Sequence, residues 1–348
     1  MSSKKLRVGV IGLGMGRGHV EGYKTHPDVE VAAICDINPE RLRDAGDKYG
    51  VQKRYADAEE MLAREHLDIV SNATPNHVHK PLTLAAFKHG CHVLCEKPMA
   101  LNAAEGREML AAARKVEKRL MIHFSYRFNP RAQELKACVD SGMLGDIYFA
   151  RTVWHRRRGM PGFGGWFGQK ALSGGGPLID LGVHRVDLAL WLMGYPRPVW
   201  VLGSTYDKIA APIAKREKKA FDVEDLAVGM IKFDNGATLE VEASWAAHIK
   251  EWEHMRTRLC GTKGGLLQYN INEGYEFEAE LYLEQNGVLG DMRLRGSGQP
   301  CPSAYFHFAD CILNNRPHIA TGEEGLIVME ILDALYASAA SGAPVKIG

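Results

Sequence analysis

The stretch VGVIGLGMGRGH, residues 8–19, joins a short apolar run rich in Val and Ile to a segment with the composition of a helix. Gly12, Gly14 and Gly16 permit a tight turn in which the backbone can approach a neighbouring group closely. A strand, a glycine turn and a helix in this order are typical of the first unit of a parallel α/β sheet. The stretch therefore predicts that the chain begins with a doubly wound α/β domain.

The residues that follow repeat this alternation of strand and helix. Further short apolar runs, separated by helix-like segments, occur at 29–36, 68–74, 92–98 and 119–126. Strands separated by helices of this length pair in parallel through right-handed crossovers. We therefore expect a Rossmann-type parallel sheet within residues 1–123.

The pattern changes after residue 123. The sequence predicts helices at 130–142, 177–192 and 323–341, and strands at 145–156, 226–233 and 237–246, the last two joined by the turn residues DNG at 234–236. The charged segment AKREKKA, residues 214–220, is expected to be an exposed loop. Residues 124–348 are thus predicted to form an α+β domain with an open, largely antiparallel sheet.

Composition limits the function. The 348 residues contain 43 basic and 42 acidic side chains, a net charge of +1, which argues against a nucleic-acid or membrane partner. Seven cysteines without a regular framework favour reduced thiols and a cytoplasmic protein. No apolar run is long enough to cross a membrane. Metabolite chemistry fits this balance best.

The glycine turn has the features of a dinucleotide-binding site. The start of the following helix offers free N–H groups and a positive dipole end to a pyrophosphate. Asp36 ends the second strand, where an acid binds the adenosine ribose of NAD and repels the extra phosphate of NADP. NAD is therefore expected over NADP. The glycine spacing is one residue short, because Arg17 stands where the third glycine usually falls.

Two more stretches follow strands of the same sheet, and ligands bind at the carboxyl ends of such strands. They are ATPNHVH at 73–79 and CEKP at 95–98. The predicted cofactor-binding residues are Gly12, Gly14, Met15, Gly16, Arg17, Asp36, Thr74, Pro75, Asn76, His79, Glu96 and Lys97.

The helix predicted at 177–192 is apolar except for a line of polar side chains. Asp180, His184 and Asp187 stack on one side of it at helical spacing. Burying such groups without partners costs several kcal/mol. The line therefore belongs either to a hydrogen-bonded core network or to the wall of a cavity.

These motifs together resemble the Gfo/Idh/MocA family of NAD(P)-dependent oxidoreductases, which includes glucose-fructose oxidoreductase and inositol dehydrogenase. The resemblance rests on EKP at 96–98, GGGPLIDLGVHRVDLALWLMG at 174–194, VEDLAVGMIKFDNGATLEVEASW at 223–245 and GTKGG at 261–265. It implies a Rossmann domain followed by a substrate-binding domain whose open sheet often forms oligomer contacts, hence a homodimer or homotetramer. It also implies that Lys97, Asp180 and His184 are the catalytic residues, with the polar line facing a cleft.

A hydride-transfer scheme for an alcohol follows from these residue types. The neutral imidazole of His184 suits the general acid/base role, Asp180 would hold or orient a hydroxyl, and Lys97 would stabilise the alcohol oxygen. No metal is needed. A sugar or cyclitol is the preferred substrate, and a sugar acid or phosphate remains possible. The candidate substrate-binding residues, besides Asp180 and His184, are Tyr126, Arg127, Asn129, Trp154, His155, Arg156 and Trp166.

Three alternatives remain open. His77 and His79, together with the D-x-x-x-H pair, have spacing that metal ligands can use, which would suit a metal-dependent hydrolase. NAD could assist glycoside cleavage through a transient keto-sugar, in which case free NADH would not accumulate. A non-catalytic NAD-binding sensor is the third alternative, and it is disfavoured because all three expected catalytic residues are present.

Overall fold

A computed structural model describes residues 5–296 and 301–348, which form two compact units. The first unit comprises residues up to His123 together with Pro302–Leu326, and the second comprises Phe124–Cys301 and Ile327–Gly348. The division predicted from the sequence also falls between residues 123 and 124, but it puts 302–326 in the second domain. This segment belongs to the first unit because helix α10 (Ala304–Leu313) packs on α1 (Gly16–Lys24), a contact that no local pattern reveals.

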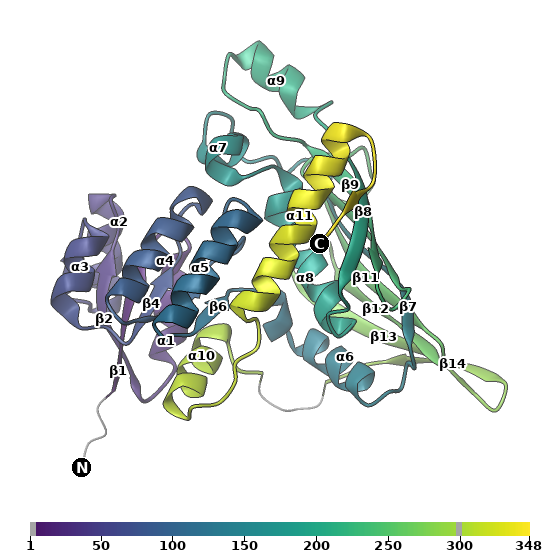
Figure 1. Cartoon of the computed structure of the whole chain (residues 1–348), viewed down its shortest axis with the longest axis horizontal. Coiled ribbons are helices and arrows are strands. Elements are labelled where there is room, and N and C mark those ends of the chain that lie inside the picture. Colours follow the sequence, from purple (N-terminus) through teal and green to yellow (C-terminus); the bar gives the residue numbers. More distant parts are fainter. Residues whose placement is uncertain (1–4, 297–300) are drawn as a thin grey trace. The chain divides into compact units, whose positions relative to one another are not determined.

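The first unit is a parallel sheet between two helix layers, as the sequence predicted (Figure 1). Its six strands have the order β3-β2-β1-β4-β5-β6. They are β1 (Leu6–Ile11), β2 (Val29–Cys35), β3 (Lys53–Tyr55), β4 (Ile69–Asn72), β5 (His92–Cys95) and β6 (Leu120–Ile122). Helices α3 (Ala58–Glu65), α4 (His79–Lys88) and α5 (Ala103–Lys115) form one layer, and α1, α2 (Pro39–Tyr49) and α10 pack on the other face.

Local chemistry explains these boundaries. The predicted start and stop of α2 are confirmed, since Asn38 caps the helix by accepting from the Glu40 and Arg41 N–H groups and Gly50 ends it with φ +70°. The Asn102 side chain likewise caps α5. The short strand β3 was not predicted, because its sequence KRY is polar and lies at the sheet edge.

The second unit contains a mixed, mostly antiparallel sheet of nine strands, which confirms the predicted fold class. The strand order is β14-β13-β12-β11-β7-β10-β9-β8-β15, and only β7 and β10 pair in parallel. The strands are β7 (Ile147–Arg156), β8 (Pro198–Tyr206), β9 (Leu226–Phe233), β10 (Thr238–Ser244), β11 (Glu253–Gly261), β12 (Gly264–Ile271), β13 (Glu276–Gln285), β14 (Val288–Arg293) and β15 (Val345–Lys346). Helices α6 (Pro130–Asp140) and α8 (Val183–Leu192) pack on one face of this sheet, and α11 (Gly322–Ser341) runs from the first unit into the second.

Two local predictions in this unit were wrong. Residues predicted as a loop at 214–220 include the last turns of helix α9 (Ala210–Glu217). Helix α9 begins at Ala210 because the carboxylate of Asp225 accepts hydrogen bonds from the Ile209 and Ala210 N–H groups. The predicted helix 177–192 is not uniform, since residues Leu178–Gly182 form a π-helical turn, η4, before α8 begins. Wide turns of this kind often occur at functional sites.

Within the described residues, no helix combines the length and apolar character needed to cross a membrane.

Candidate functional site

The glycine turn of the first unit is shaped for close backbone approach. Gly12 has φ +87°, and a Cβ there would lie 2.5 Å from the Ala73 carbonyl oxygen. A Cβ on Gly16 would lie 3.0 Å from the Val10 side chain, so Gly16 lets α1 pack tightly against β1. Gly16 therefore performs the packing role of the usual third glycine. This accounts for the short spacing and leaves Arg17 on the first turn of α1.

Asp36 connects the end of β2 to this turn. Its carboxylate accepts from the Leu13 N–H at 2.6 Å and from the Asn38 N–H at 2.7 Å. The structure also reveals a residue that the sequence analysis did not consider: the Arg41 guanidinium lies 3.7 Å from the position of a Cβ on Gly14. An acid and an arginine thus border the glycine turn.

The loops after β4 and β5 are joined by His79. Its Nδ1 lies 2.8 Å from the Pro98 carbonyl oxygen and its Nε2 lies 2.8 Å from the Thr74 carbonyl oxygen. The imidazole is completely buried, so both nitrogens are used within the protein. His79 was predicted to bind the cofactor. The structure instead shows it positioning the loops that contain Thr74, Pro75 and Lys97.

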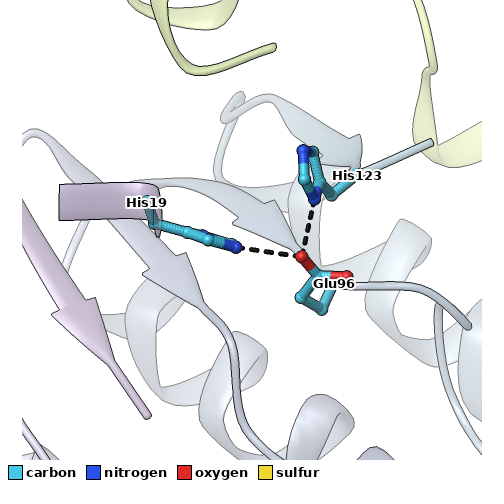
Figure 2. Close-up of side chains that lie close together, drawn as sticks. All are labelled: His19, Glu96 and His123. Carbon is cyan, nitrogen blue, oxygen red and sulfur yellow. Dashed lines mark hydrogen bonds and ion pairs between the residues drawn. The ribbon is translucent and has the colours of Figure 1, made fainter. Parts of the chain in front are cut away.

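Glu96 forms a cluster with two histidines that the sequence analysis missed, His19 and His123 (Figure 2). Among the described residues, this is the group whose donor atoms could hold a metal ion. The histidines could not be found from local motifs, since His19 is on α1 and His123 follows β6.

In the second unit, η4 and α8 position Asp180 and His184. The Trp245 indole N–H donates to Asp180 Oδ2 at 2.9 Å. The His184 ring lies 5.0 Å from the Tyr126 ring and 5.7 Å from the Trp154 ring, measured between centroids. Two predicted catalytic residues and two predicted substrate-binding residues therefore come together in this unit.

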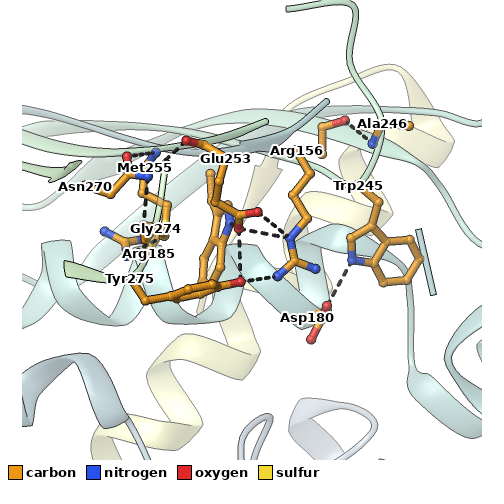
Figure 3. Close-up of polar contacts among 12 residues, drawn as sticks. Arg156, Asp180, Arg185, Trp245, Ala246, Glu253, Met255, Asn270, Gly274 and Tyr275 are labelled. Carbon is orange, nitrogen blue, oxygen red and sulfur yellow. Dashed lines mark hydrogen bonds and ion pairs between the residues drawn. The ribbon is translucent and has the colours of Figure 1, made fainter. Parts of the chain in front are cut away.

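A charged network extends this group (Figure 3). Arg156 Nε donates to Glu253 Oε1 at 3.0 Å, and Arg156 Nη2 donates to the Tyr275 hydroxyl at 2.8 Å. The Trp154 indole N–H donates to the same Glu253 oxygen at 2.5 Å. Burial lowers the pKa of Arg156, but Glu253, Tyr275 and Asp180 together raise it above its ordinary value. The guanidinium charge is thus balanced within the protein.

The guanidinium of Arg185 packs against the aromatic side chains of this group. Its guanidinium carbon lies 4.3 Å from the Tyr126 ring centroid and 5.3 Å from those of Trp154 and Phe277. The side chain is fully buried. Cation–π contacts of this kind are stronger where water is excluded, so they hold the rings in place.

Gly176, the last of the glycines at 174–176, is explained by Glu224. This carboxylate accepts from the Gly176 N–H at 2.9 Å, the Leu178 N–H at 3.0 Å and the Tyr336 hydroxyl at 2.8 Å. A Cβ on Gly176 would lie 2.1 Å from the Glu224 carbonyl oxygen. Glu224 thereby anchors the start of η4, the turn that contains Asp180.

Arg127 was predicted to bind substrate, but its guanidinium is used inside the unit. Arg127 and Asp187 are both fully buried and are joined by hydrogen bonds of 2.6 and 3.0 Å. The polar line on the helix therefore divides. Asp187 belongs to a core ion pair, whereas Asp180 and His184 belong to the group around Trp154.

The remaining residues that were predicted to bind substrate make contacts within the protein. Asn129 caps α6 by accepting from the Arg131 N–H at 3.0 Å, and Trp166 stacks on Phe167 with ring centroids 3.8 Å apart. Because side chains alternate along a strand, His155 points to the other sheet face from Trp154 and Arg156. There its Nε2 lies 3.4 Å from a Glu242 carboxylate oxygen. None of these contacts supports a substrate-binding role.

Comparisons agree with this architecture. Residues 6–124 match the oxidoreductase family with the NAD-binding Rossmann fold, and residues 132–267 match the GFO/IDH/MocA C-terminal domain. The chain therefore belongs to the Gfo/Idh/MocA oxidoreductase family, and it is an enzyme of the dehydrogenase type.

Individual relatives are similar over nearly the whole chain. D-glucoside 3-dehydrogenase of Escherichia coli is 35% identical, covering 100% of this chain and 99% of the relative. Myo-inositol 2-dehydrogenase of Thermotoga maritima is 31% identical over 93% of each. Among solved structures, aldose-aldose oxidoreductase of Caulobacter crescentus complexed with glycerol has a TM-score of 0.84 at 29% identity, covering 99% of this chain and 100% of that one. Levoglucosan dehydrogenase in complex with NADH has a TM-score of 0.87 at 25% identity, covering 99% of both chains.

Proposed function

We propose that this protein oxidises a secondary hydroxyl of an uncharged sugar, glycoside or cyclitol with NAD. The observation that carries the proposal is the grouping of Asp180 and His184 with Trp154, Trp245 and the balanced Arg156–Glu253 pair. Aromatic faces with a few fixed polar groups suit a polyol, whose C–H faces stack on rings while its hydroxyls form hydrogen bonds. The relatives named for a glucoside, an inositol and levoglucosan support this substrate class.

His184 is the proposed general base that takes the hydroxyl proton, since a neutral imidazole has a pKa of about 6.5 and accepts protons near neutral pH. Asp180, held by Trp245, orients a substrate hydroxyl. Lys97 stabilises negative charge on the reacting oxygen.

The first unit fits a dinucleotide. The Gly12 turn leaves no room for a Cβ, and the first turn of α1 has no side-chain cap that would compete with a phosphate for its N–H groups. When bound, NAD supplies the hydride acceptor. The Asp36 carboxylate favours NAD because the extra phosphate of NADP would add negative charge beside it.

The hydrogen bonds of Arg156 favour an uncharged substrate. An arginine that recognises an anion needs a free guanidinium edge and an unbalanced charge. Here the guanidinium already donates to Glu253 and Tyr275. An anion that approached this edge of Arg156 would have to displace these bonds, which favours an uncharged substrate.

The test is the absorbance at 340 nm of purified protein with NAD or NADP and a panel of glycosides, sugars, cyclitols, sugar acids and sugar phosphates. We expect NADH to form with NAD and an uncharged polyol. His184→Ala and Lys97→Ala should each lower turnover at least a hundredfold, while the exposed His66→Asn serves as a matched control that leaves it unchanged. Near-normal turnover in either catalytic variant would overturn the roles. Tight NAD binding without NADH formation would favour NAD-assisted glycoside cleavage.

A further inference from the structure

Two histidine side chains of the first unit, His19 and His123, converge on one carboxylate oxygen of Glu96 (Figure 2). His19 Nε2 lies 2.9 Å from Glu96 Oε1, and His123 Nδ1 lies 2.6 Å from the same oxygen. The other ring nitrogen of His19 lies 2.7 Å from the Ser71 hydroxyl. If the hydroxyl donates to Nδ1, the Nε2 of a neutral His19 carries its proton and donates it to Glu96.

The cluster is enclosed. The Tyr305 ring of α10 lies 4.7 Å from the His19 ring and 5.0 Å from the His123 ring. Gly22 makes room for it, since a Cβ there would lie 2.0 Å from the Tyr305 ring. The His19, Glu96 and His123 side chains keep 1%, 12% and 13% of their surface exposed. A charge in such surroundings is weakly screened and acts strongly on its neighbours.

The network keeps Glu96 ionised. Burial alone would raise the pKa of this carboxyl, but the charge and hydrogen bonds of His123 and His19 outweigh burial and hold it well below its ordinary value. Burial lowers the pKa of His19, which favours its neutral form.

The spacing of the cluster is that of hydrogen bonds. Nitrogen and oxygen ligands of a tetrahedral zinc ion, each about 2.0–2.1 Å from the metal, would be about 3.3 Å apart. Both nitrogens of the cluster lie closer to the Glu96 oxygen than that.

The position of the cluster on the sheet suggests what this charge does. Asp36, at the end of β2, marks the half of the sheet that takes the adenosine. Glu96 and His123 follow β5 and β6 in the other half, where the nicotinamide half of a dinucleotide binds. The nicotinamide ring is positively charged in NAD+ and uncharged in NADH.

We propose that His19 and His123 hold Glu96 as a carboxylate so that the site prefers NAD+ to NADH. This inference rests on the proposed use of NAD. The two histidines are positioning residues, and their effect is to favour oxidation of the substrate and release of NADH.

The experiment measures the Kd values of NAD+ and NADH separately by isothermal titration calorimetry at pH 7. Glu96→Gln keeps the shape and removes the charge. We expect it to raise the Kd of NAD+ about tenfold, equivalent to about 1.4 kcal/mol, and to change that of NADH less than twofold. His123→Phe should also raise the Kd of NAD+ relative to that of NADH, because a buried carboxylate that loses a donor takes up a proton more readily.

A matched control is His92→Asn, at the amino end of β5, which should leave the ratio unchanged. Equal weakening of both nucleotides by Glu96→Gln and His123→Phe would overturn the proposal and leave only a structural role. A ratio that changes when zinc chloride is added to EDTA-treated protein would overturn it in favour of a metal site. If the unaltered protein binds neither nucleotide, the use of NAD itself fails, a result distinct from an unchanged ratio.

Discussion

Replacing Asp187 with leucine should destabilise the second unit strongly without affecting the chemistry directly. The substitution removes the carboxylate that pairs with Arg127 at 2.6 Å and accepts from the Tyr195 hydroxyl at 2.8 Å. Both charged side chains are fully buried, so Asp187→Leu leaves a guanidinium without its carboxylate partner. Breaking a buried pair in this way costs about 3–5 kcal/mol. At about 2–4 °C per kcal/mol for a domain of this size, Tm should fall by about 6–20 °C.

The double variant Arg127→Met/Asp187→Leu tests the reason for this loss. Well-packed apolar residues often replace a buried ion pair without loss of stability, so most of the lost Tm should return. Thermal melts followed by circular dichroism measure the change, and the Kd of NAD, which concerns the first unit, should stay the same. A single variant that melts within about 2 °C of the unaltered protein would refute the argument. Recovery of Tm without recovery of turnover would show that Arg127 contacts the substrate after all.

Three further predictions concern the cofactor, the catalytic turn and acid stability. Asp36→Ser should raise the affinity for NADP at least tenfold, since it removes the repelling carboxylate and leaves Arg41 beside the glycine turn; an unchanged NADP Kd, measured by titration, would contradict this. Trp245→Phe removes the hydrogen bond to Asp180 and should lower kcat about tenfold while NAD affinity stays the same, whereas equal loss of both would indicate general misfolding. Burial lowers the pKa values of His92 and His307 to about 4, and each accepts a main-chain N–H. Their contribution to stability is therefore fully present above pH 6.5 and is lost as the pH falls from 6.5 to 4, because the unfolded chain takes up protons first. Urea unfolding midpoints at pH 7.5 and 5 should show the loss, and His92→Gln should reduce it; equal midpoints would contradict the assignment.

Much of the proposed cofactor site could be predicted because its determinants are local. The Gly12 turn, the acid at Asp36 and the positions of Thr74 and Lys97 follow from where strands of a parallel sheet end. The packing role of Gly16 could not be predicted, because only its contact with Val10 shows that the short spacing still provides the close approach.

In the second unit the line of polar side chains could be predicted from the sequence. That its members have different partners could not. Helical spacing places Asp180, His184 and Asp187 on one side of a helix and says nothing of what faces them. The structure supplies Trp245 for Asp180, 65 positions away in sequence, and Arg127 for Asp187, 60 positions away. The ion pair of Arg127 with Asp187 could not be predicted because its two residues are distant in the chain.

The parallel and antiparallel sheets, the glycine turn and the catalytic candidates could all be predicted from the order of the amino acids. These features depend on periodicity, glycine conformation and strand ends, which are properties of neighbouring residues. The pairing of polar side chains depends on the folded chain: Glu96 pairs with His19 and His123, Arg156 with Glu253, and Glu224 with the start of η4. The reason is that a buried polar group must find its hydrogen-bond partner wherever packing brings one, at any separation along the chain.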